Sequence, residues 1–332
     1  MKSVESQPRA GHRPGPGAAR GELLADVAEM YFLEGKTQAQ IARKVGVTRS
    51  MVSRMLSEAR AAGIVEFSVR RPLSLDAGLA ADLKKRFGLR QARVVAARAE
   101  DGQRRLRRLG AAGAQVLGGF LRPGLKLGLT WGTAVRATLQ ALEVESRVPS
   151  LKIVQLIGAL GARIEDYDGH ALVRALETRL GGEAYYINAP FLVDSREAAQ
   201  ELLANRSLAE TIALARQCDV ALLGVGSVEP QHSSFYQAGY VPLRDLKALQ
   251  REGAVGDVCG LHFTAGGKPA GADFSSRLVG INERQLRAIP VRIGVAGGSG
   301  KAAPVLGALR GGYINILVTD DLVARVLLKE DE

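Results

Sequence analysis

The chain is poor in cysteine, in aromatic residues and in long apolar runs. Of its 332 residues only two are cysteines, Cys218 and Cys259, and they match neither a metal-binding spacing nor a disulfide framework. No apolar run approaches the length that spans a membrane. The polar, Pro/Gly-rich first residues also lack the apolar segment of a secretory signal. We therefore expect a cytoplasmic protein with two small buried cysteines, no metal and no cofactor.

Positive charge, in contrast, is abundant and unevenly placed. The formal net charge is +11, which favours a polyanionic partner. Many of the basic residues lie early in the chain, at positions 43, 44, 49, 54, 60, 70, 71, 84–86 and 104–108. With 46% hydrophobic residues, the chain can also build a sizeable core and two domains. Composition thus indicates a globular protein with an electropositive N-terminal region.

Residues 36–56, KTQAQIARKVGVTRSMVSRML, have the pattern of a helix-turn-helix. Thr37 can cap the first helix, and Gln40 three residues later completes a capping box. Gly46 stands where the turn needs a positive φ. Thr48 can cap the second helix. The spacing predicts two short helices at the angle that places the second one in a DNA groove.

One face of this segment is apolar and the other offers short polar and basic side chains. Ile41, Ala42, Val45, Val47, Val52 and Met55 form the predicted core. Arg49, Ser50, Ser53 and Arg54 suit base edges and phosphates, and Gln38 and Thr48 suit phosphates. The alternative interpretation is an ordinary helical hairpin with a solvated basic face. DNA binding is favoured because an amphipathic helix over 23–33 precedes the motif and a strand-like run over 64–69 can form a wing.

The composition changes along the chain suggest three zones. We expect a disordered basic tail over residues 1–20, which could touch DNA phosphates, and a winged helix-turn-helix over 21–72. Residues 73–332 alternate between strand-like and helical patterns, which predicts an α/β domain with a largely parallel sheet. The predicted strands are residues 92–96, 125–129, 153–157, 184–188, 220–225, 291–296 and 314–319. The predicted helices are residues 105–121, 133–142, 171–180, 207–217, 301–309 and 322–328.

Four glycine-containing loops could bind a ligand beyond the carboxyl ends of these strands. Residues 128–133, GLTWGT, join a strand to a helix and could hold an anion, although a plain capped turn is equally compatible. Residues 294–301, GVAGGSGK, end in Lys301 but lack the spacing of a nucleotide-binding loop. Residues 223–227, LGVGS, lack the third glycine of a dinucleotide fingerprint. Residues 253–260 contain Asp257, which could bind sugar hydroxyls or order its own loop.

Catalytic signatures are weak. His170, His232 and His262 stand in no triad or metal motif, and His262 lies in an apolar strand-like run that suggests a structural role. A site assembled from distant loops stays open. The rivals to a DNA-binding regulator are a phosphosugar isomerase or deaminase fused to a DNA-binding domain, a sugar kinase with a regulatory helix-turn-helix, and a recombinase.

The motifs resemble, in their order, the SorC family of bacterial regulators. They run QIARKVGVTRSMVSRML, GLTWGT, VQLIGALGA, CDVALLGVGSV, GAVGDVCG, GVAGGSGK and LRGGYINILVTDDLVARVLL. The resemblance covers nearly the whole chain after the tail. It implies an N-terminal DNA-binding domain and a Rossmann-like effector domain related to glucosamine-6-phosphate deaminase and ribose-5-phosphate isomerase. It also implies a phosphorylated sugar, or a related sugar or polyol, as effector, and a homodimer or homotetramer on operator DNA.

The resemblance also assigns roles to residues of the effector domain. It implies that Thr130, Trp131, Gly132 and Thr133 receive a phosphate, that Lys301 helps neutralise it, and that Asp257 lies near sugar hydroxyls. Ala189, in the Asn-Ala-Pro turn of residues 188–190, matches a strand end beside the pocket. Some family members hold the sugar through a lysine Schiff base, for which Lys152 is an early-strand candidate. We thus expect a DNA-binding regulator of a carbohydrate-utilisation operon without enzymatic activity.

Overall fold

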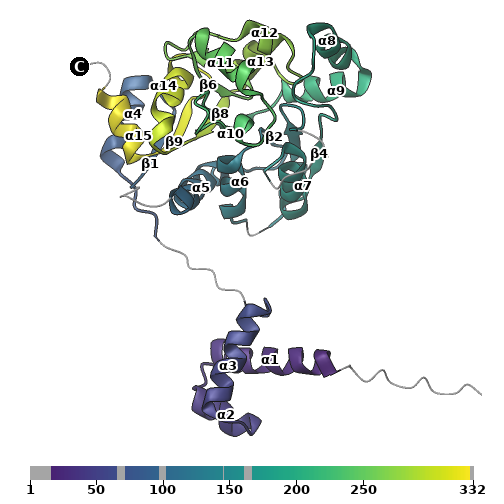
Figure 1. Cartoon of the computed structure of the whole chain (residues 1–332), viewed down its shortest axis with the longest axis vertical. Helices are drawn as coiled ribbons and strands as arrows, with labels where there is room; N and C mark the ends of the chain where they lie inside the picture. Colours follow the sequence, from purple (N-terminus) through teal and green to yellow (C-terminus); the bar gives the residue numbers. More distant parts are fainter. Residues whose placement is uncertain (1–15, 66–71, 97–101, 145, 161–166, 330–332) are drawn as a thin grey trace, which may run out of the picture. The chain divides into compact units, whose positions relative to one another are not determined.

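The computed structural model describes residues 16–65, 72–96, 102–144, 146–160 and 167–329. The chain divides into two compact units, Met1–Pro72 and Leu73–Glu332 (Figure 1). None of the helices among the described residues is long and apolar enough to cross a membrane. Each unit has its own hydrophobic core.

The described residues of the first unit form three helices, α1 (Pro16–Phe32), α2 (Gln38–Val45) and α3 (Arg49–Ala61). The predicted caps of the last two are confirmed. Thr37 and Gln40 form the reciprocal capping box of α2, and the Thr48 hydroxyl accepts a hydrogen bond from the Met51 amide at the start of α3. Gly46 ends α2 with a φ of 72°. The local sequence signals therefore specify both helices and the turn between them.

The core of the first unit is built by residues that face each other across the three helices. Ile41 and Val52 are fully buried, and Ala42 is 7% exposed, as the pattern predicts. α1 contributes Leu24, Val27, Ala28 and Met30. A small side chain at Ala42 is consistent with helices that pack closely.

Two expectations for this unit need correction. Residues 16–20, placed in a disordered tail, belong to α1, and Arg20 forms an ion pair with Glu58 of α3 at 2.6 Å. Residues 1–15 lie outside the described residues. Of the predicted wing over 64–69, Ile64 and Val65 are not in a strand, and residues 66–69 lie outside the described residues.

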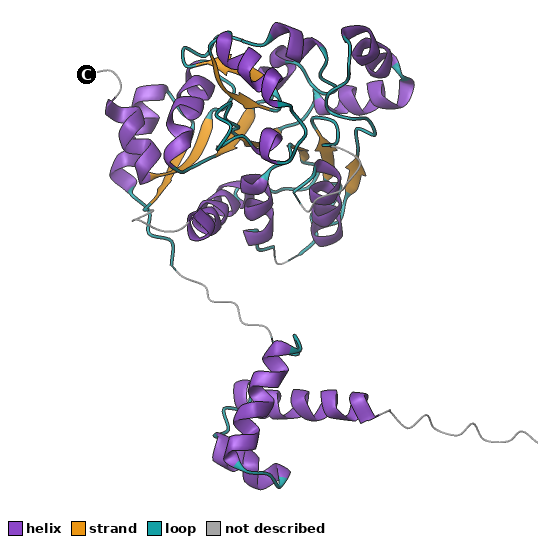
Figure 2. Cartoon of the chain, in the orientation of Figure 1, coloured by secondary structure: helices purple, strands orange, loops and turns teal. Residues whose placement is uncertain are grey.

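The second unit is built on a parallel sheet, which the alternating sequence pattern predicts. Seven strands among the described residues form this sheet, drawn in orange in Figure 2 with the strands of a separate hairpin. Their order is β1-β9-β8-β5-β2-β3-β4, and every neighbouring pair is parallel. The strands are β1 (Gln91–Val95), β2 (Lys126–Leu129), β3 (Lys152–Gln155), β4 (Glu183–Tyr185), β5 (Val220–Gly224), β8 (Val291–Val295) and β9 (Ile316–Asp320). All seven coincide with the predicted strands to within a few residues.

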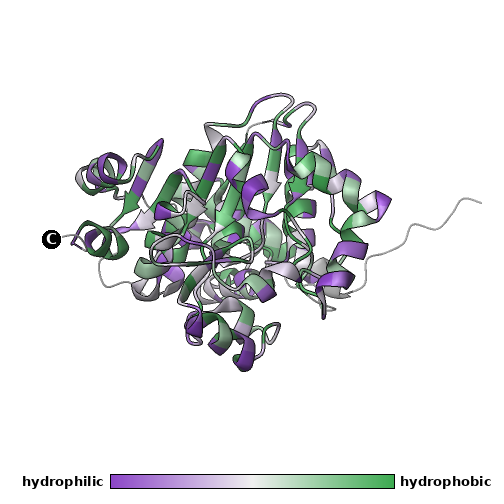
Figure 3. Ribbon diagram, turned by 90° about the horizontal axis from the view of Figure 1, so that it is seen from above, coloured by the Kyte–Doolittle hydropathy of each residue, from purple (hydrophilic) through white to green (hydrophobic). Residues whose placement is uncertain are grey.

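Helices cover both faces of this sheet, and the strands carry near-continuous apolar residues because both sides are buried (Figure 3). One face packs on α5 (Gly102–Gly118), α6 (Thr133–Ala141) and α7 (Gly169–Leu180). The other packs on α4 (Ala77–Phe87), α9 (Arg206–Ala215), α14 (Ala302–Arg310) and α15 (Asp321–Lys329). The predicted helices are confirmed, except that α4 was not predicted and α14 starts one residue after Lys301.

A hairpin lies outside the main sheet, and its first strand falls in residues 253–260, which were predicted to be a loop. Strands β6 (Ala254–Val258) and β7 (Leu261–Thr264) pair antiparallel. Cys259 and Gly260 connect them with φ values of 59° and 73°, the positive pair that a tight two-residue turn of this kind requires. Five short helices among the described residues were also missed, namely α8 (Arg196–Ala204), α10 (Ser234–Gln237), α11 (Leu243–Arg251), α12 (Ala272–Ser276) and α13 (Glu283–Ala288).

The strand order determines where a ligand can bind. From β2 the chain moves to β3 and β4 on one side of the sheet, and from β5 it moves to β8 and β9 on the other. The crossover connections after β2 and β5 therefore leave in opposite directions. Such a switch point opens a crevice at the carboxyl ends of the two strands.

Candidate functional site

A pocket of about 130 Å³ lies at this switch point. Its walls come from the loops after β2, β5 and β8, from α5, and from the β6–β7 hairpin. The lining includes Leu106, Leu109, Thr130, Trp131, Gly132, Thr133, Gly224, Val225, Gly226, Ser227, Ser234, Phe235, Asp257, Cys259, Gly260, Gly297 and Lys301. Segments far apart in the sequence thus converge on one small volume.

The loop after β2 provides an anion-binding helix terminus. Gly132 precedes α6 with a φ of 133°, and no side chain caps the first amides of that helix. Thr133 is the first helical residue, and its side chain is exposed. Uncapped amides at a helix N-terminus attract negative charge. The geometry at Gly132 and Thr133 is compatible with a bound phosphate or carboxylate.

Thr130, by contrast, already has a structural role. It is 3% exposed, and its hydroxyl accepts a hydrogen bond from the Gly224 amide at 3.4 Å and lies 3.5 Å from the Leu222 carbonyl oxygen. These contacts join the ends of β2 and β5. Thr130 therefore holds the mouth of the crevice together.

The glycine loop after β8 carries a half-buried lysine to the pocket. The Lys301 ammonium donates a hydrogen bond to the Val225 carbonyl oxygen at 2.8 Å, and burial lowers its pKa. Asp320, fully buried at the end of β9, accepts hydrogen bonds from the amides of Gly298 at 2.7 Å and Val323 at 2.9 Å. Asp320 thereby orders the loop that positions Lys301. This positioning residue was not identified from the sequence, although it directly follows the predicted strand over residues 314–319.

Asp257 projects from β6 rather than from a loop. It is 5% exposed; its Oδ2 accepts a hydrogen bond from the Gly260 amide, and its Oδ1 has no hydrogen-bond partner among the described residues. Burial raises the pKa of this carboxyl, while His262 and Lys301 act in the opposite direction. An unsatisfied buried carboxyl oxygen is costly unless a ligand supplies a donor.

Trp131 presents a second unsatisfied group in the same pocket. Its ring packs edge-on against Phe235 at 4.6 Å and Phe191 at 5.8 Å between centroids. Its indole Nε1 is buried and has no hydrogen-bond partner among the described residues. An unsatisfied donor and an unsatisfied acceptor in one cavity match a hydroxyl group, which can serve both.

The structure brings most of the predicted effector residues together. Thr130, Trp131, Gly132, Thr133, Asp257 and Lys301 all line the pocket. Ala189 does not line it; this residue is 8% exposed, and its carbonyl oxygen accepts a hydrogen bond from the Ala159 amide. Phe191, two residues later, reaches the pocket wall through Trp131.

Lys152 lies at the wrong end of the sheet for a role in this pocket. It is the first residue of β3, so it stands at the amino end of the strand, and its ammonium lies 3.9 Å from Glu183 and 5.6 Å from the Tyr185 ring centroid. The pocket is at the carboxyl ends. The suggestion that Lys152 bonds a sugar in this pocket is therefore wrong. Among the described residues no three His, Cys, Asp or Glu side chains are arranged to hold a metal ion.

In the first unit, α3 presents a continuous polar face. Arg49, Ser50, Ser53 and Arg54 are exposed, whereas Val52, Met55, Leu56 and Ala59 are buried on the opposite side. Gln38 is half-buried at the start of α2. The Thr48 hydroxyl is 3.0 Å from the Ser50 hydroxyl and also caps α3, so part of its hydrogen-bonding capacity is used within the unit.

Known protein families match both units of the chain. A family model for a sugar-binding domain matches residues 71–329, and a model for region 4 of sigma-70 matches residues 24–62. The sorbitol operon regulator of Klebsiella pneumoniae is 30% identical over 308 residues, which cover 92% of this chain and 98% of that regulator. The deoxyribonucleoside regulator of Bacillus subtilis is 29% identical over 316 residues, which cover 93% of this chain and 98% of the relative.

A solved structure of one of these relatives is also similar to this chain over nearly its whole length. The crystal structure of the full-length sorbitol operon regulator SorC from Klebsiella pneumoniae has a TM-score of 0.70 and 29% sequence identity, and the match covers 94% of this chain and 100% of that one. These relatives are transcriptional regulators, and this chain is a DNA-binding regulator rather than an enzyme. The chain belongs to the SorC family, with a helix-turn-helix region followed by a sugar-binding α/β domain.

Proposed function

We propose that this protein regulates a carbohydrate-utilisation operon in the cytoplasm and that a phosphorylated sugar, or a related sugar or polyol, binds in the pocket at the switch point. The observation that carries the proposal is the convergence of an uncapped helix N-terminus, Lys301 and two unsatisfied buried polar atoms in one cavity. One relative is named a sorbitol operon regulator and another a deoxyribonucleoside regulator, which supports a carbohydrate effector.

The two ends of the pocket suit the two ends of a sugar phosphate. The phosphate would lie at Gly132 and Thr133, where α6 amides and the Thr133 hydroxyl can donate, with Lys301 supplying a positive charge. The sugar hydroxyls would meet Asp257 Oδ1 and Trp131 Nε1. We also assign the α/β unit to the Rossmann-like class of phosphosugar isomerases and deaminases, because the resemblance to the SorC family implies it and a pocket at the switch point of a parallel sheet is compatible with it.

The size of the pocket suggests how binding is transmitted. Typical ligand pockets occupy about 300–1,000 Å³, whereas this cavity is about 130 Å³. A sugar phosphate would therefore have to move the surrounding loops apart. An effector can shift DNA binding only by binding one arrangement of the protein more tightly than the other.

On DNA, two copies of the chain would place their α3 helices in successive major grooves about 34–36 Å apart. Arg49, Ser50, Ser53 and Arg54 would face the bases, with Gln38 and Thr48 near phosphates. We propose a homodimer or homotetramer because a single three-helix unit covers only one half-site.

Calorimetric titration with a panel of sugar phosphates, free sugars and polyols tests the effector site. Thr133→Ala should weaken binding of a phosphorylated ligand by about 10–100-fold, since a hydrogen bond to a charged group contributes about 1.5–3 kcal/mol. Lys301→Met should weaken it as well. Thr178→Ala and Lys247→Met, the same changes at surface positions outside the pocket, serve as controls.

The pattern of losses distinguishes the possibilities. Binding of a sugar phosphate that is lost in both pocket variants and kept in both controls supports the assignment. Binding of an unphosphorylated polyol that both pocket variants retain would remove the phosphate from the proposal. A panel without any binder would contradict the effector site and leave the DNA-binding unit unaffected.

A further inference from the structure

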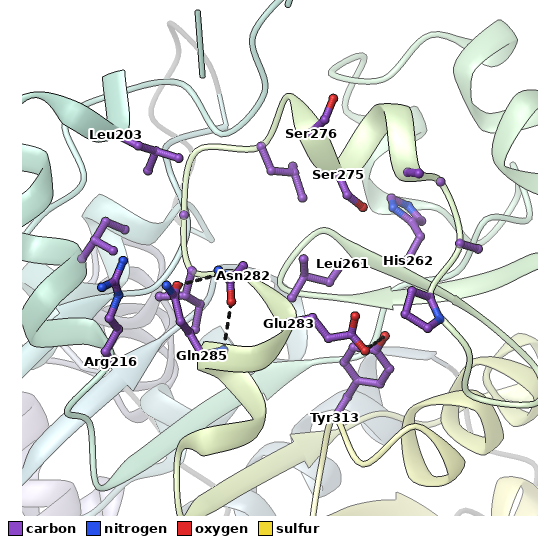
Figure 4. Close-up of a pocket in the computed structure, with 18 of the residues that line it drawn as sticks. Leu203, Arg216, Leu261, His262, Ser275, Ser276, Asn282, Glu283, Gln285 and Tyr313 are labelled. Atoms are coloured by element: carbon purple, nitrogen blue, oxygen red, sulfur yellow. Dashed lines mark hydrogen bonds between the residues drawn. The ribbon is translucent and has the colours of Figure 1, made fainter. Parts of the chain in front are cut away.

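Whereas β6 and the turn of the hairpin line the effector pocket, a second and larger cavity is lined by β7 of the hairpin. Its volume is about 550 Å³, and its lining residues come from α8, α9, α12, α13, the hairpin and the segment that contains Leu278 and Gly280. It shares no lining residue with the effector pocket. Figure 4 shows this cavity, with Leu203 and Arg216 on one side and His262 and Tyr313 on the other. This volume falls within the range of about 300–1,000 Å³ that small-molecule sites occupy.

The lining of the second cavity suits an uncharged ligand with hydroxyl groups. It combines apolar side chains such as Leu203, Leu261 and Leu278 with polar ones from Ser275 and His262. A mixed apolar and polar lining of this kind is typical of sites for small ligands with one apolar face.

Hydrogen bonds inside the wall leave both donors and acceptors for a ligand. Asn282 and Gln285 use their side-chain oxygens to cap α13, so the donors of their amide groups remain. Glu283 Oε1 accepts from the Tyr313 hydroxyl at 3.1 Å, and Glu252 Oε2 accepts from the Gly271 amide at 2.8 Å. Each of these carboxylates keeps further lone pairs that can accept from a hydroxyl.

Charge separates this cavity from the effector pocket. Its lining contains two carboxylates, Glu252 and Glu283, against one guanidinium, Arg216. Burial lowers the pKa of His262, which favours the neutral ring. Arg287 pairs with Glu283 at 2.5 Å, so a phosphate would meet no net positive charge here, whereas the effector pocket offers it Lys301 and the start of α6. The second cavity therefore disfavours a sugar phosphate.

The two cavities are separated by a thin common wall. In the β6–β7 ladder Asp257 pairs with His262; Asp257 lines the effector pocket and His262 lines the second cavity. The isolated bridge between Ile157 and Gly280 repeats this arrangement, with Ile157 on the effector side and Gly280 on the other. Movement of the wall by one ligand must therefore change the shape of the other cavity.

We propose that the cavity between the β6–β7 hairpin, α9, α12 and α13 is a second ligand site, which takes an uncharged polyhydroxy compound with an apolar face, such as a nucleoside or a glycoside. We further propose that this site is coupled to the effector pocket through the shared hairpin, and this coupling rests on the proposed function of that pocket.

Saturation-transfer NMR on the full-length protein tests the site, with uridine and methyl glucoside as uncharged probes and glucose 6-phosphate as the charged comparison. Ser275→Trp places a large ring in the cavity from α12, and Leu203→Trp does so from α8 on the opposite wall. Asp273→Trp adds the same ring to α12 at a side chain that is 83% exposed and outside the cavity. Melting curves verify that each variant is folded.

The site is supported if a probe binds to the wild type, Asp273→Trp and Thr133→Ala proteins and fails to bind to both folded cavity-filling variants. Two outcomes would overturn it: transfer to neither uncharged probe, or transfer that survives both fillings. Loss of probe binding in Thr133→Ala would place the probe in the effector pocket instead and would also overturn it. Glucose 6-phosphate binding that disappears in Thr133→Ala alone reports on the effector pocket, so the two proposals fail separately.

The coupling has its own readout. By linkage, saturation of one site must change the affinity of the other by the same factor in both directions, and couplings of this kind are about 5–150-fold. We expect the effect of the bound uncharged probe on sugar-phosphate affinity to vanish in Ser275→Trp. Equal affinities with and without the second ligand would overturn the coupling and retain the site.

Discussion

The two units of this protein assemble their functional surfaces differently. In the helix-turn-helix unit, every residue proposed to meet DNA lies between Gln38 and Arg54, and local hydrogen bonds place each of them. In the sugar-binding unit, the pocket draws on segments from Leu106 to Lys301 that meet only in the folded sheet. A contiguous surface depends on helix geometry alone, whereas a converging one depends on strand order and on buried polar contacts. The two surfaces should therefore respond separately to substitution.

The largest expected effect is the loss of one unit without the other. Val52 is fully buried in the first unit, and Val52→Asp places a charge there at a cost of roughly 3–5 kcal/mol. DNA binding should be abolished while sugar-phosphate binding persists. Melting curves should lose one transition, and calorimetry should give an unchanged affinity for the effector. Ser57→Asp, on the exposed side of the same helix, controls for the effect of an added negative charge on stability. Loss of effector binding in Val52→Asp would show that the units depend on each other.

The reverse separation should follow from a single methyl group in the pocket. A Cβ at Gly226 would lie 1.8 Å from Asp257 Oδ1, so Gly226→Ala must displace that carboxyl group, at a cost of about 1–3 kcal/mol. Effector affinity should fall by at least about tenfold, with operator binding by the ligand-free protein unchanged. At Gly102, which lies outside the pocket, the same methyl would have no heavy atom within 4 Å, so Gly102→Ala is the matched control. Equal losses in both variants would contradict the role of Asp257.

A third substitution sharpens the description of the DNA-binding surface. If Arg54 reads guanine, Arg54→Ala should cost about 1–3 kcal/mol of discrimination between operator and unrelated DNA. If Arg54 contacts only phosphate, the variant should weaken binding to all sequences alike and reduce the salt dependence. Titration of both DNAs at several salt concentrations separates the two. Arg60→Ala, in the last turn of α3, should weaken binding less because it lies far from the amino-terminal end of that helix.

The smallest effect concerns pH and stability. Burial raises the pKa of Asp257, so the stability it contributes is fully present below about pH 4, its unfolded value, and is lost as pH rises through the raised pKa. Asp257→Asn does not titrate and should therefore gain in melting temperature relative to the wild type as pH increases from 4 to 8. Asp273→Asn, the same change at an exposed carboxyl, is the surface control. If the difference in melting temperature between Asp257→Asn and the wild type stays constant with pH, the raised pKa of Asp257 is contradicted.

Several site residues could be predicted because their signals are local. Thr37, Gln40, Gly46 and Thr48 act on amides within a few residues of themselves, so their roles follow from spacing alone. The glycine loops after β2 and β8 were recognisable because each joins a strand to a helix. The predicted membership of Thr133, Asp257 and Lys301 in one site came from the family resemblance, and the structure brings them to one cavity.

Other features could not be predicted because their causes are long-range. Asp320 orders the glycine loop across 22 residues, and Thr130 joins two strands across 94. Strand β6 was read as part of a glycine loop because Gly256 lies within it and further glycines lie just outside it on each side, and its pairing with the strand-like run at His262 was not predicted. From the sequence, Lys152 was a candidate for a covalent bond to the sugar. The strand direction, however, places it at the amino ends of the strands, whereas the pocket lies at their carboxyl ends.

By itself, the sequence determined the helices, caps and turn of the first unit and the strand-helix alternation of the second, because short-range hydrogen bonds and apolar periodicity specify them. Only the tertiary structure decided which loops meet at the switch point, that Trp131 and Asp257 remain unsatisfied there, and that a second cavity shares the hairpin wall. These features depend on strand order and on which buried polar groups find partners. Both are properties of packing between segments that are distant in the chain.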